Sequence, residues 1–392
     1  MPRSTVRLMA VATAVVIANM YFAQPLEDVL ARAMTVPVGA VGVVLTLFQV
    51  GFAAGLAFLV PLGDLLERRR LVAVMLSVSV LGMVVLATAP KLEVLALGAV
   101  LVGMTSVVAQ IIVPFAAHLA AAHERGRIVS TVMSGLLIGV LVSRTVAGLL
   151  AQIGGWRAVF AVGAAATAIV GVPLYRSLPT AAPTTTLTYP KLLGSVLTLV
   201  RDEPLLQVRM TFGALAFASF SAFWSSVGFM LAKPPYSWNS AAIGAIALIG
   251  VAGALVARIA GHLADQGYAS LATGGSLVVL CASYAALFLG GNHIVALVLG
   301  VAAMDMGAQG IHISNQSVVY RLRPDAHSRI TTAYMTSHFA GGALGSGLAS
   351  VLIYPHFDWT GVCLLGATFP AIGILIWSLD QLRGNGSNTD AP

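Results

Sequence analysis

The chain has 392 residues, of which 58% are hydrophobic and 9% are charged, and its mean hydropathy is +0.92. Soluble domains carry about 25% charged residues, so this composition excludes an ordinary soluble globular protein. The formal net charge is +7. A lipid bilayer is the solvent that suits such a chain, and only helices or closed barrels satisfy their backbone groups there.

Twelve apolar runs of helix length follow one another along the chain, each long enough to cross about 30 Å of hydrocarbon. They lie near 7–30, 39–61, 71–89, 93–117, 128–151, 156–175, 206–231, 240–262, 270–290, 293–320, 330–353 and 359–380. One long polar connection, rich in proline and threonine, separates the first six runs from the last six. The sequence therefore predicts an all-α membrane protein of twelve transmembrane helices, with a six-helix bundle over 1–178, a cytoplasmic linker over 179–205, a second six-helix bundle over 206–382 and a cytoplasmic tail over 383–392.

Lysine and arginine are concentrated in alternate connections, which predicts that both chain termini are cytoplasmic. The positive net charge then reflects membrane topology and gives no case for nucleic-acid binding, which needs one concentrated basic face. Cys281 and Cys363 both fall inside predicted spans, so neither a disulfide framework nor a metal-ligand cluster is indicated. We expect no cofactor and no metal.

The two halves of the chain repeat one another at a nearly constant offset. RIVSTVMSG at 127–135 aligns with RITTAYMTS at 329–337, an offset of 202 residues. Asp64 lies 201 residues before Asp265, and Trp156 lies 203 residues before Trp359. An internal repeat in a membrane protein is typical of transporters, whose binding sites lie between the repeats.

The loop PLGDLLERRR after the second run, and its repeat mate GHLADQG, resemble a signature loop of the major facilitator superfamily. With the runs and the repeat, the resemblance covers nearly the whole chain, although Val60 and Glu67 stand where the signature has glycines. It implies two pseudo-symmetric six-helix bundles and a conformational latch that biases one access state over the other. The alternative is that the arginines of this loop only enforce topology. The latch residues that the resemblance implies are Asp64, Arg68, Arg69, Arg70, Gly261, Asp265 and Gly267.

The fifth run contains GVLVSRTVAG, which resembles a drug-antiporter motif of small residues that form a tight helix contact. Arg144 stands where that motif has proline. A guanidinium inside a span costs about 2.5–3.5 kcal/mol at the centre, so it normally faces a cavity or a partner. Arg144 therefore contacts substrate, pairs with an intramembrane acid, or snorkels to the outer interface.

Two helical stripes carry polar side chains in the second half. Asp305, Gln309, His312 and Gln316 share one face of the tenth run at 100° per residue, and Tyr334 and His338 share one face of the eleventh. An ionised carboxylate would be costly there, which makes Asp305 a candidate proton carrier. The alternative is a structural acid satisfied by neighbouring helices. The predicted proton-coupling residues are Asp305, His312 and His338. Should Asp305 prove structural, the coupling site is to be sought elsewhere, beginning with His312, His338 and Asp28.

Other polar or aromatic side chains within the spans are candidates to line a substrate cavity. For each alone, an interhelical hydrogen bond of about 0.6 kcal/mol, or plain packing, is the competing interpretation. The predicted substrate-binding residues are Arg144, Tyr21, Gln24, Gln49, Gln110, Gln309, Gln316, Trp224 and Tyr334.

The stretches NMYFAQPLEDVLA, VVAQIIVPFAAHLA and MDMGAQGIHISNQSVVYRLRP resemble a bacterial subgroup of drug or metabolite proton antiporters. This resemblance implies a monomeric secondary transporter of the cytoplasmic (inner) membrane that contacts membrane lipid. It would export a small organic solute or drug-like compound in exchange for protons. Proton-coupled uptake or lipid translocation is the alternative. No catalytic motif of an intramembrane hydrolase occurs, so we expect no enzyme activity.

Overall fold

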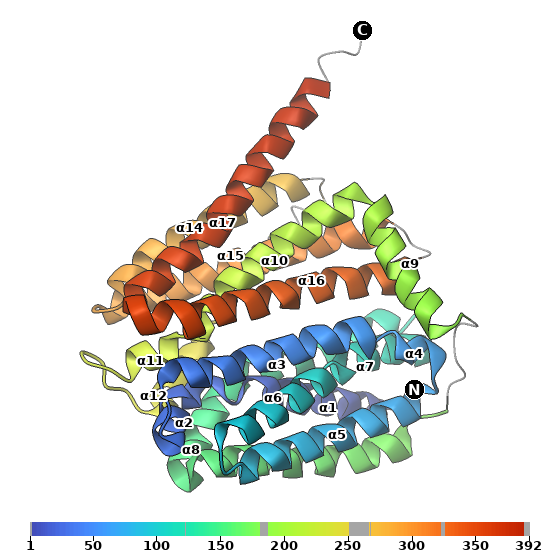
Figure 1. The fold of residues 1–392 in the computed structure, drawn as a ribbon. Helices are drawn as coiled ribbons and strands as arrows, with labels where there is room; N and C mark the ends of the chain where they lie inside the picture. The colour runs from blue at the N-terminus through green and yellow to red at the C-terminus, as the bar shows by residue number, and fades with distance from the viewer. Residues whose placement is uncertain are drawn as a thin grey trace. The chain divides into compact units, whose positions relative to one another are not determined.

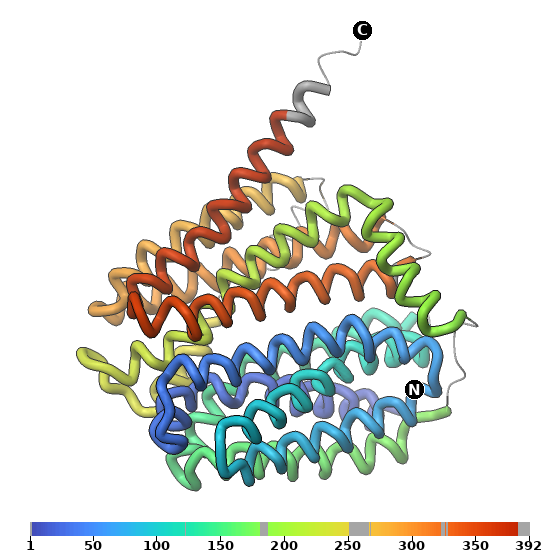
Figure 2. The backbone as a smooth tube through the Cα atoms, viewed as in Figure 1, coloured from blue at the N-terminus to red at the C-terminus, as the bar shows by residue number. Residues whose placement is uncertain are grey.

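The computed structural model of the protein describes residues 2–121, 123–180, 187–250, 266, 268–322 and 326–387. Across these ranges every regular element is helical and no strand occurs, which confirms the predicted all-α class. The backbone, traced in Figure 2, forms two compact units. Unit 1 comprises Met1–Leu199 with Gly228–Leu248, and unit 2 comprises Val200–Val227 with Ile249–Pro392. Residues 228–248, which belong to the second predicted bundle, thus pack within unit 1.

Unit 1 is a bundle in which α1 packs along α8, α3 along α6, and α5 against both α6 and α8 (Figure 1). Its elements are α1 (Arg3–Tyr21), η1 (Gln24–Leu26), α2 (Glu27–Met34), α3 (Val38–Phe58), α4 (Leu62–Leu65), α5 (Arg68–Thr88), α6 (Leu92–Ser106), α7 (Val108–Leu119), α8 (Arg125–Ser177), α9 (Tyr189–Asp202, whose last residues belong to unit 2) and α12 (Ser240–Ala245). Two short elements, α11 (Val227–Leu231) and η2 (Ile246–Gly250), flank α12.

Unit 2 is a second bundle, in which α14 packs against α15 and α17, and α10 packs against α16 and α17. Its elements are α10 (Pro204–Trp224), α14 (Ala269–Leu289), α15 (Ile294–Leu322), α16 (His327–Gly347), the π-helical segment η4 (Leu348–Ile353) and α17 (Tyr354–Ser387).

Glycines let paired helices approach backbone to backbone, and two of these contacts lie at corresponding positions of the repeat. A Cβ on Gly139 of α8 would lie 2.9 Å from the Cα of Ala14 on α1. A Cβ on Gly341 of α16 would lie 2.6 Å from the Cα of Ala214 on α10. Gly139 and Gly341 are repeat mates at the offset of 202 residues. The sequence repeat is therefore also a repeat of helix packing.

The first predicted run is broken near its C-terminal end. α1 ends at Tyr21, the 3₁₀ helix η1 covers Gln24–Leu26, and α2 begins at Glu27. Pro25 lies at the start of η1, where its missing N–H leaves no helical hydrogen bond unmade. In a 3₁₀ turn, side chains three residues apart eclipse one another, so this break aligns Gln24 with Glu27.

Nine helical stretches among the described residues are long and apolar enough to cross a membrane, judged by length and composition. Two of them, Arg125–Ser177 with 53 residues and Ser328–Leu382 with 55, are about twice as long as one crossing needs. Each contains one residue with positive φ, Gly155 at 74° and Asp358 at 49°, where the helix is interrupted. The eighth predicted run, 240–262, extends beyond the described residues.

The predicted linker contains a helix, α9, in its second half. The proline- and threonine-rich composition ends near Tyr189, and the following stretch has apolar residues at helical spacing. Leu192 and Leu199, seven residues apart, are both buried. The hydroxyl of Tyr189 donates a hydrogen bond of 2.7 Å to the carbonyl of Phe58 at the end of α3. The linker is thus attached to unit 1 by specific contacts.

Candidate functional site

Buried polar side chains gather in each unit, and two groups of them are defined here by their residues. The Arg144 cluster of unit 1 comprises Tyr21, Gln24, Glu27 and Arg144. The His312 cluster of unit 2 comprises Arg209, His312, Asn315, Tyr334 and His338.

Arg144 lies inside unit 1 and is 3% exposed. Its Nε donates a hydrogen bond of 2.6 Å to Oε1 of Gln24, and its Cζ lies 4.6 Å from the centroid of the Tyr21 ring. A planar guanidinium can satisfy both contacts because it donates in its plane and stacks with its face. Three of the predicted substrate-binding residues therefore meet, and Arg144 contacts other protein groups; its role in substrate binding stays a prediction.

Glu27 completes this cluster and was not predicted from the sequence. It is 0% exposed. Within the described part of the chain, neither of its carboxyl oxygens makes a hydrogen bond of ordinary geometry. The backbone N–H of Phe229 is close enough to the carboxyl for a weak hydrogen bond, and the charge of Arg144 also acts on it. Such a buried acid without strong hydrogen bonds is costly, and in membrane helices acids of this kind are usually functional.

The break in the first run separates Glu27 from its neighbour Asp28, which was one of the fallback candidates for proton coupling. On a continuous helix, Asp28 shares a face with Tyr21 and Gln24, because 3.6 residues complete a turn. The 3₁₀ segment η1 changes this register and aligns Glu27 with Gln24. Asp28 forms an ion pair with Arg32 one turn further along α2. A signal was present in Pro25, which marks a break in the helix.

Residues 228–248 close over the Arg144 cluster. A Cβ on Gly228 would lie 2.7 Å from Oε2 of Glu27, so α11 reaches the carboxyl itself. α12 packs on α8, where the Oγ1 of Thr145 donates 3.0 Å to the carbonyl of Gly244. A Cβ on Gly148 would lie 2.9 Å from the Cα of Ala241. The small residues of the fifth run thus permit the close helix contact that its motif predicts.

The two other polar candidates of unit 1 lie on separate helices. Gln49 is 5% exposed on α3, and Gln110 is half-buried on α7, just after the break at Val107 between α6 and α7. Their assignment to the substrate cavity stays a prediction. Asn19 of α1, by contrast, donates a hydrogen bond of 2.9 Å to Thr167 of α8 and is an interhelical link.

The predicted stripes of the tenth and eleventh runs meet in the His312 cluster. Nδ1 of His312 lies 3.2 Å from the hydroxyl of Tyr334, and the rings of His312 and His338 are 4.7 Å apart. Nδ1 of His338 lies 3.0 Å from the carbonyl of Gly213 on α10. Because a carbonyl only accepts, Nδ1 of His338 carries the proton, and Nε2 is the acceptor of the neutral ring.

Arg209 and Asn315 extend this cluster, and sequence reasoning assigned neither. Arg209, which is 8% exposed on α10, donates to Oγ1 of Thr273 at 3.0 Å and to Oδ1 of Asn315 at 3.4 Å. Asn315 returns a bond of 3.2 Å to the carbonyl of Arg209 and also interacts with the hydroxyl of Tyr334. A polar chain therefore runs from Arg209 through Asn315 and Tyr334 to His312. The sequence signal that could have identified this cluster was Arg209, a charged residue inside the apolar run 206–231.

The remaining members of the tenth-run stripe lie on α15. Asp305 is 5% exposed, while Gln309 and Gln316 are half-buried. Their assigned roles stay predictions.

Trp224, at the end of α10, is a further predicted substrate-binding residue. It is 3% exposed and continues a line of aromatic rings, with its ring centroid 6.1 Å from that of Phe220.

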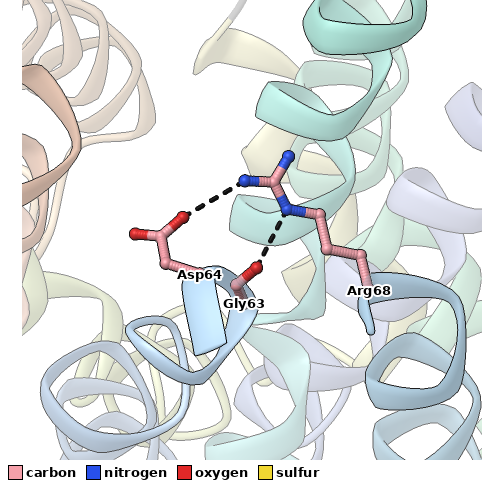
Figure 3. A network of polar contacts seen from close by, with 3 residues as sticks. All are labelled: Gly63, Asp64 and Arg68. Atoms are coloured by element: carbon pink, nitrogen blue, oxygen red, sulfur yellow. Dashed lines mark hydrogen bonds and ion pairs between the residues drawn. The ribbon is translucent and has the colours of Figure 1, made fainter. Parts of the chain in front are cut away.

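The first copy of the predicted latch is folded around Arg68 (Figure 3). Its Nε donates to the carbonyl of Gly63 at 2.9 Å, and its Nη2 bonds Oδ1 of Asp64 at 3.1 Å. Arg69 lies with its Cζ 4.3 Å from the Tyr175 ring, whereas the side chain of Arg70 is 84% exposed. The acid and the first arginine of the signature therefore form one local unit at the start of α5.

Glu67, which departs from the family signature, has a structural role. Its carboxylate accepts hydrogen bonds of 3.0 Å from the backbone N–H groups of Arg69 and Arg70 and so caps the N-terminus of α5. The second copy of the latch, with Gly261, Asp265 and Gly267, lies outside the described residues.

Metal chemistry has no candidate centre in the described ranges, where no group of three or more His, Cys, Asp or Glu side chains could hold an ion. Apolar helices of spanning length, paired by repeat and holding buried polar clusters, define a multi-pass membrane transporter.

Comparison with known families supports the same class. Residues 9–346 match the family model of the Major Facilitator Superfamily. The chain belongs to this superfamily, which confirms the resemblance found in the sequence. It is therefore a secondary transporter of small-molecule substrates and is not an enzyme.

Named relatives cover nearly the same length. The chain is 46% identical over 370 residues to a putative uncharacterized transporter, YgaY, of Escherichia coli (strain K12), which covers 94% of each chain. It is 34% identical to the probable transporter SCO4007 of Streptomyces coelicolor, over 96% of this chain and 86% of that one.

Solved structures of low identity share the fold. The nucleoside transporter NupG superposes with a TM-score of 0.76 at 14% identity, covering 96% of this chain and 99% of that one. A bacterial homolog of the human lysosomal transporter Spinster, inward-facing and occupied, gives 0.76 at 13% identity over 96% of each chain.

Proposed function

We propose that the protein exports a small organic or drug-like solute across the bacterial cytoplasmic (inner) membrane by alternating access, in exchange for protons. The observation that carries this proposal is the Arg144 cluster, where a guanidinium and a carboxyl are enclosed within one helix bundle. Ionisable groups enclosed in this way can bind or release a proton or a charged solute only when the enclosure opens. Opening and binding are then coupled.

We also propose twelve spans in two six-helix bundles over 1–178 and 206–382, with both termini cytoplasmic and the protein monomeric. Two of the nine spanning stretches are long enough to cross twice and are interrupted once each. Counting each of these as two crossings adds two spans, and the run at 240–262, which is shared with α12, supplies the twelfth. The two glycine-paired helix contacts support the repeat on which the division rests.

The site residues are assigned on the same basis. The Arg144 cluster and the His312 cluster are proposed to bind solute or protons, because each gathers buried or half-buried polar side chains next to one another. Asp305 remains a proposed proton site, and Asp64 with Arg68 a proposed latch. For each proton, about 100 mV of membrane potential and one pH unit supply about 2.3 and 1.4 kcal/mol. Together they sustain a solute gradient of several hundredfold, at about 1.4 kcal/mol per factor of ten.

The test is flux in proteoliposomes with an imposed proton gradient. Three probes cover the charge classes of solute: ethidium as an organic cation, chloramphenicol as a neutral compound and fluorescein as an organic anion. We expect at least one probe to move opposite to the proton and to stop when an ionophore collapses the gradient. Movement with the proton would support metabolite uptake instead. Flux that is insensitive to the gradient would overturn proton coupling in both directions.

A further inference from the structure

We propose that Glu27 is a proton-exchange site of the transport cycle and that residues 228–248, which carry α12 and most of α11, are the cover that closes it. The inference rests on the proposed proton-coupled transport and names the group and the moving part. It is carried by the enclosure of this carboxyl and by the segment that completes the enclosure.

Glu27 is enclosed by elements from distant parts of the chain. η1 precedes it, α8 supplies Arg144, and α11 supplies Gly228 and Phe229. Its side chain is 0% exposed, and in the described part of the chain its oxygens lack hydrogen bonds of ordinary geometry. Among the described residues, the packing leaves no surface of Glu27 accessible to water, and Gly228 lies directly against the carboxyl. We therefore assign residues 228–248 as the part that moves when a proton enters or leaves.

The electrostatic surroundings of Glu27 are simple. The titratable groups that face the cluster are Tyr21 on α1 and Arg144 on α8. α3, α11 and α12 carry no ionisable side chain over their lengths. On α2 itself, Asp28 and Arg32 are paired with one another. Between α11 and α12, Lys233 is exposed. Arg144 is the cation whose charge acts on Glu27 among the described residues.

The contact at Gly228 links the carboxyl to the cover. A Cβ at this position would lie 2.7 Å from Oε2 and 3.2 Å from the carbonyl of Gln24, so α11 packs closely on the carboxyl and on the η1 backbone. At the other end of the cover, Gly244 lies against the backbone of Arg144, where a Cβ would meet its carbonyl. The same segment therefore contacts both the acid and the backbone of its counter-charge.

The exchange step is a simple proton transfer. When the cover leaves, water reaches the carboxyl and the O–H bond of Glu27 breaks, with the proton passing to water and the electron pair remaining on the carboxylate. Arg144 then balances the negative charge. The reverse step restores the neutral carboxyl before the cover returns. No oxidant, metal or further reactant takes part.

Infrared spectroscopy of the purified full-length protein tests this directly. A pH-difference spectrum should contain the carbonyl band of a protonated carboxyl that is lost in Glu27→Gln. Asp28→Asn is the matched control, because Asp28 is the adjacent acid but is ion-paired and partly exposed. Its spectrum should keep the band. A Glu27→Gln spectrum identical to that of the parent would overturn the proposal.

A second variant protects the test against misfolding. Glu27→Asp keeps a carboxyl that is shorter by one methylene, so the band should persist at a shifted position while Glu27→Gln loses it. If Glu27→Gln does not fold, Glu27→Asp alone decides. A carbonyl band at the same position in Glu27→Asp and in the parent would overturn the proposal, because such a band does not come from residue 27.

Cysteine accessibility tests the cover. Ser240 at the start of α12 is 8% exposed and packs on Gly148 of α8. The test uses Ser240→Cys in a protein whose native Cys281 and Cys363 have been replaced. Its alkylation rate is measured at each pH with Glu27 present and with Glu27→Gln. Taking the ratio of the two rates at the same pH removes the effect of pH on the ionisation of the thiol. We expect the ratio of the two rates to change with pH. A ratio that is constant across pH would show that Glu27 does not control the cover.

The flux assay separates this inference from the proposed function. Coupled probe movement in the parent that is retained in full by Glu27→Gln would overturn the role of Glu27 and leave proton-coupled export standing. Gradient-insensitive flux in the parent would overturn the proposed function. The infrared band would still decide whether Glu27 exchanges a proton.

Discussion

The Nε of Arg144 bonds Oε1 of Gln24 at 2.6 Å although 120 residues separate them in the chain. The bond joins the C-terminal end of the broken first run to the middle of α8. The same guanidinium covers the ring of Tyr21. Arg144 thus links α8 to Tyr21 of α1, and the same two helices approach closely at Gly139.

Replacing Arg144 by lysine should therefore reduce transport strongly. An ammonium keeps the charge but cannot stack on Tyr21 while bonding Gln24 in the same plane. A hydrogen bond to a charged group contributes about 1.5–3 kcal/mol, which corresponds to roughly 10- to 100-fold in flux. Flux of the responding probe in proteoliposomes measures the effect. Arg157→Lys is the control, since this exposed arginine contacts Trp156 and a backbone carbonyl, and it should transport like the parent. Equal flux in both variants would contradict a binding role for Arg144.

Adding side-chain volume at Gly148 should unseat α12. A Cβ there would meet the backbone of Ser240 and lie 2.9 Å from the Cα of Ala241, and neither can retreat without moving the helix. Gly148→Ala should cost about 1–3 kcal/mol, the usual penalty of overpacking, and raise the alkylation rate of Ser240→Cys. Gly126→Ala in the first turn of the same helix meets nothing within 4 Å and should leave both properties near the parent values. The melting temperature in detergent and the alkylation rate are the two readouts.

Glu67→Ala should destabilise the start of α5. The substitution removes the carboxylate that accepts from the backbone N–H groups of Arg69 and Arg70, and losing an N-cap costs about 0.5–2 kcal/mol. The free energy of unfolding in detergent measures the loss. Glu93→Ala on α6 removes an exposed first-turn acid that leaves the capping position unchanged, and should stay within about 0.5 kcal/mol of the parent. A Glu67→Ala protein as stable as the Glu93→Ala protein would show that the cap does not matter.

The sequence predicted the helical class, the repeat and the superfamily because these depend on properties summed over many residues. Hydropathy over about 20 residues and a constant offset survive local errors. The meeting of Arg144 with Tyr21 and Gln24 was also accessible, since a charge inside a span needs polar partners.

Local changes of helix geometry account for what the sequence did not reveal. Because of the 3₁₀ turn at Gln24–Leu26, Glu27 rather than Asp28 is the acid that faces the interior of unit 1. A uniform helical period of 3.6 residues does not reveal this change of register. The packing of residues 228–248 in unit 1 depends on contacts between distant glycines, which no local pattern encodes. Helix α9 was hidden by the prolines and threonines that precede it.

His338 allows a last test, because within the described residues its Nδ1 has a hydrogen-bond partner and its Nε2 has none. Nδ1 donates to the carbonyl of Gly213, and the ring lies 4.2 Å from that of Phe217 and 4.7 Å from that of His312. Asparagine can reproduce the Nδ1 donor but has no counterpart of Nε2. We expect His338→Asn to keep most of the melting temperature and to lose proton-dependent flux, while His338→Leu loses the hydrogen bond as well and costs about 1–3 kcal/mol of stability.

The control for this test is His356→Asn. His356 makes the same kind of bond, from Nδ1 to the carbonyl of Leu352 at 2.7 Å, but it is exposed. Its substitution should change neither stability nor flux. If His338→Asn also retains full proton-dependent flux, His338 serves packing alone, because the only function removed is that of Nε2. If flux is lost while the protein stays folded, Nε2 takes part in transport, and the His312 cluster belongs to the route.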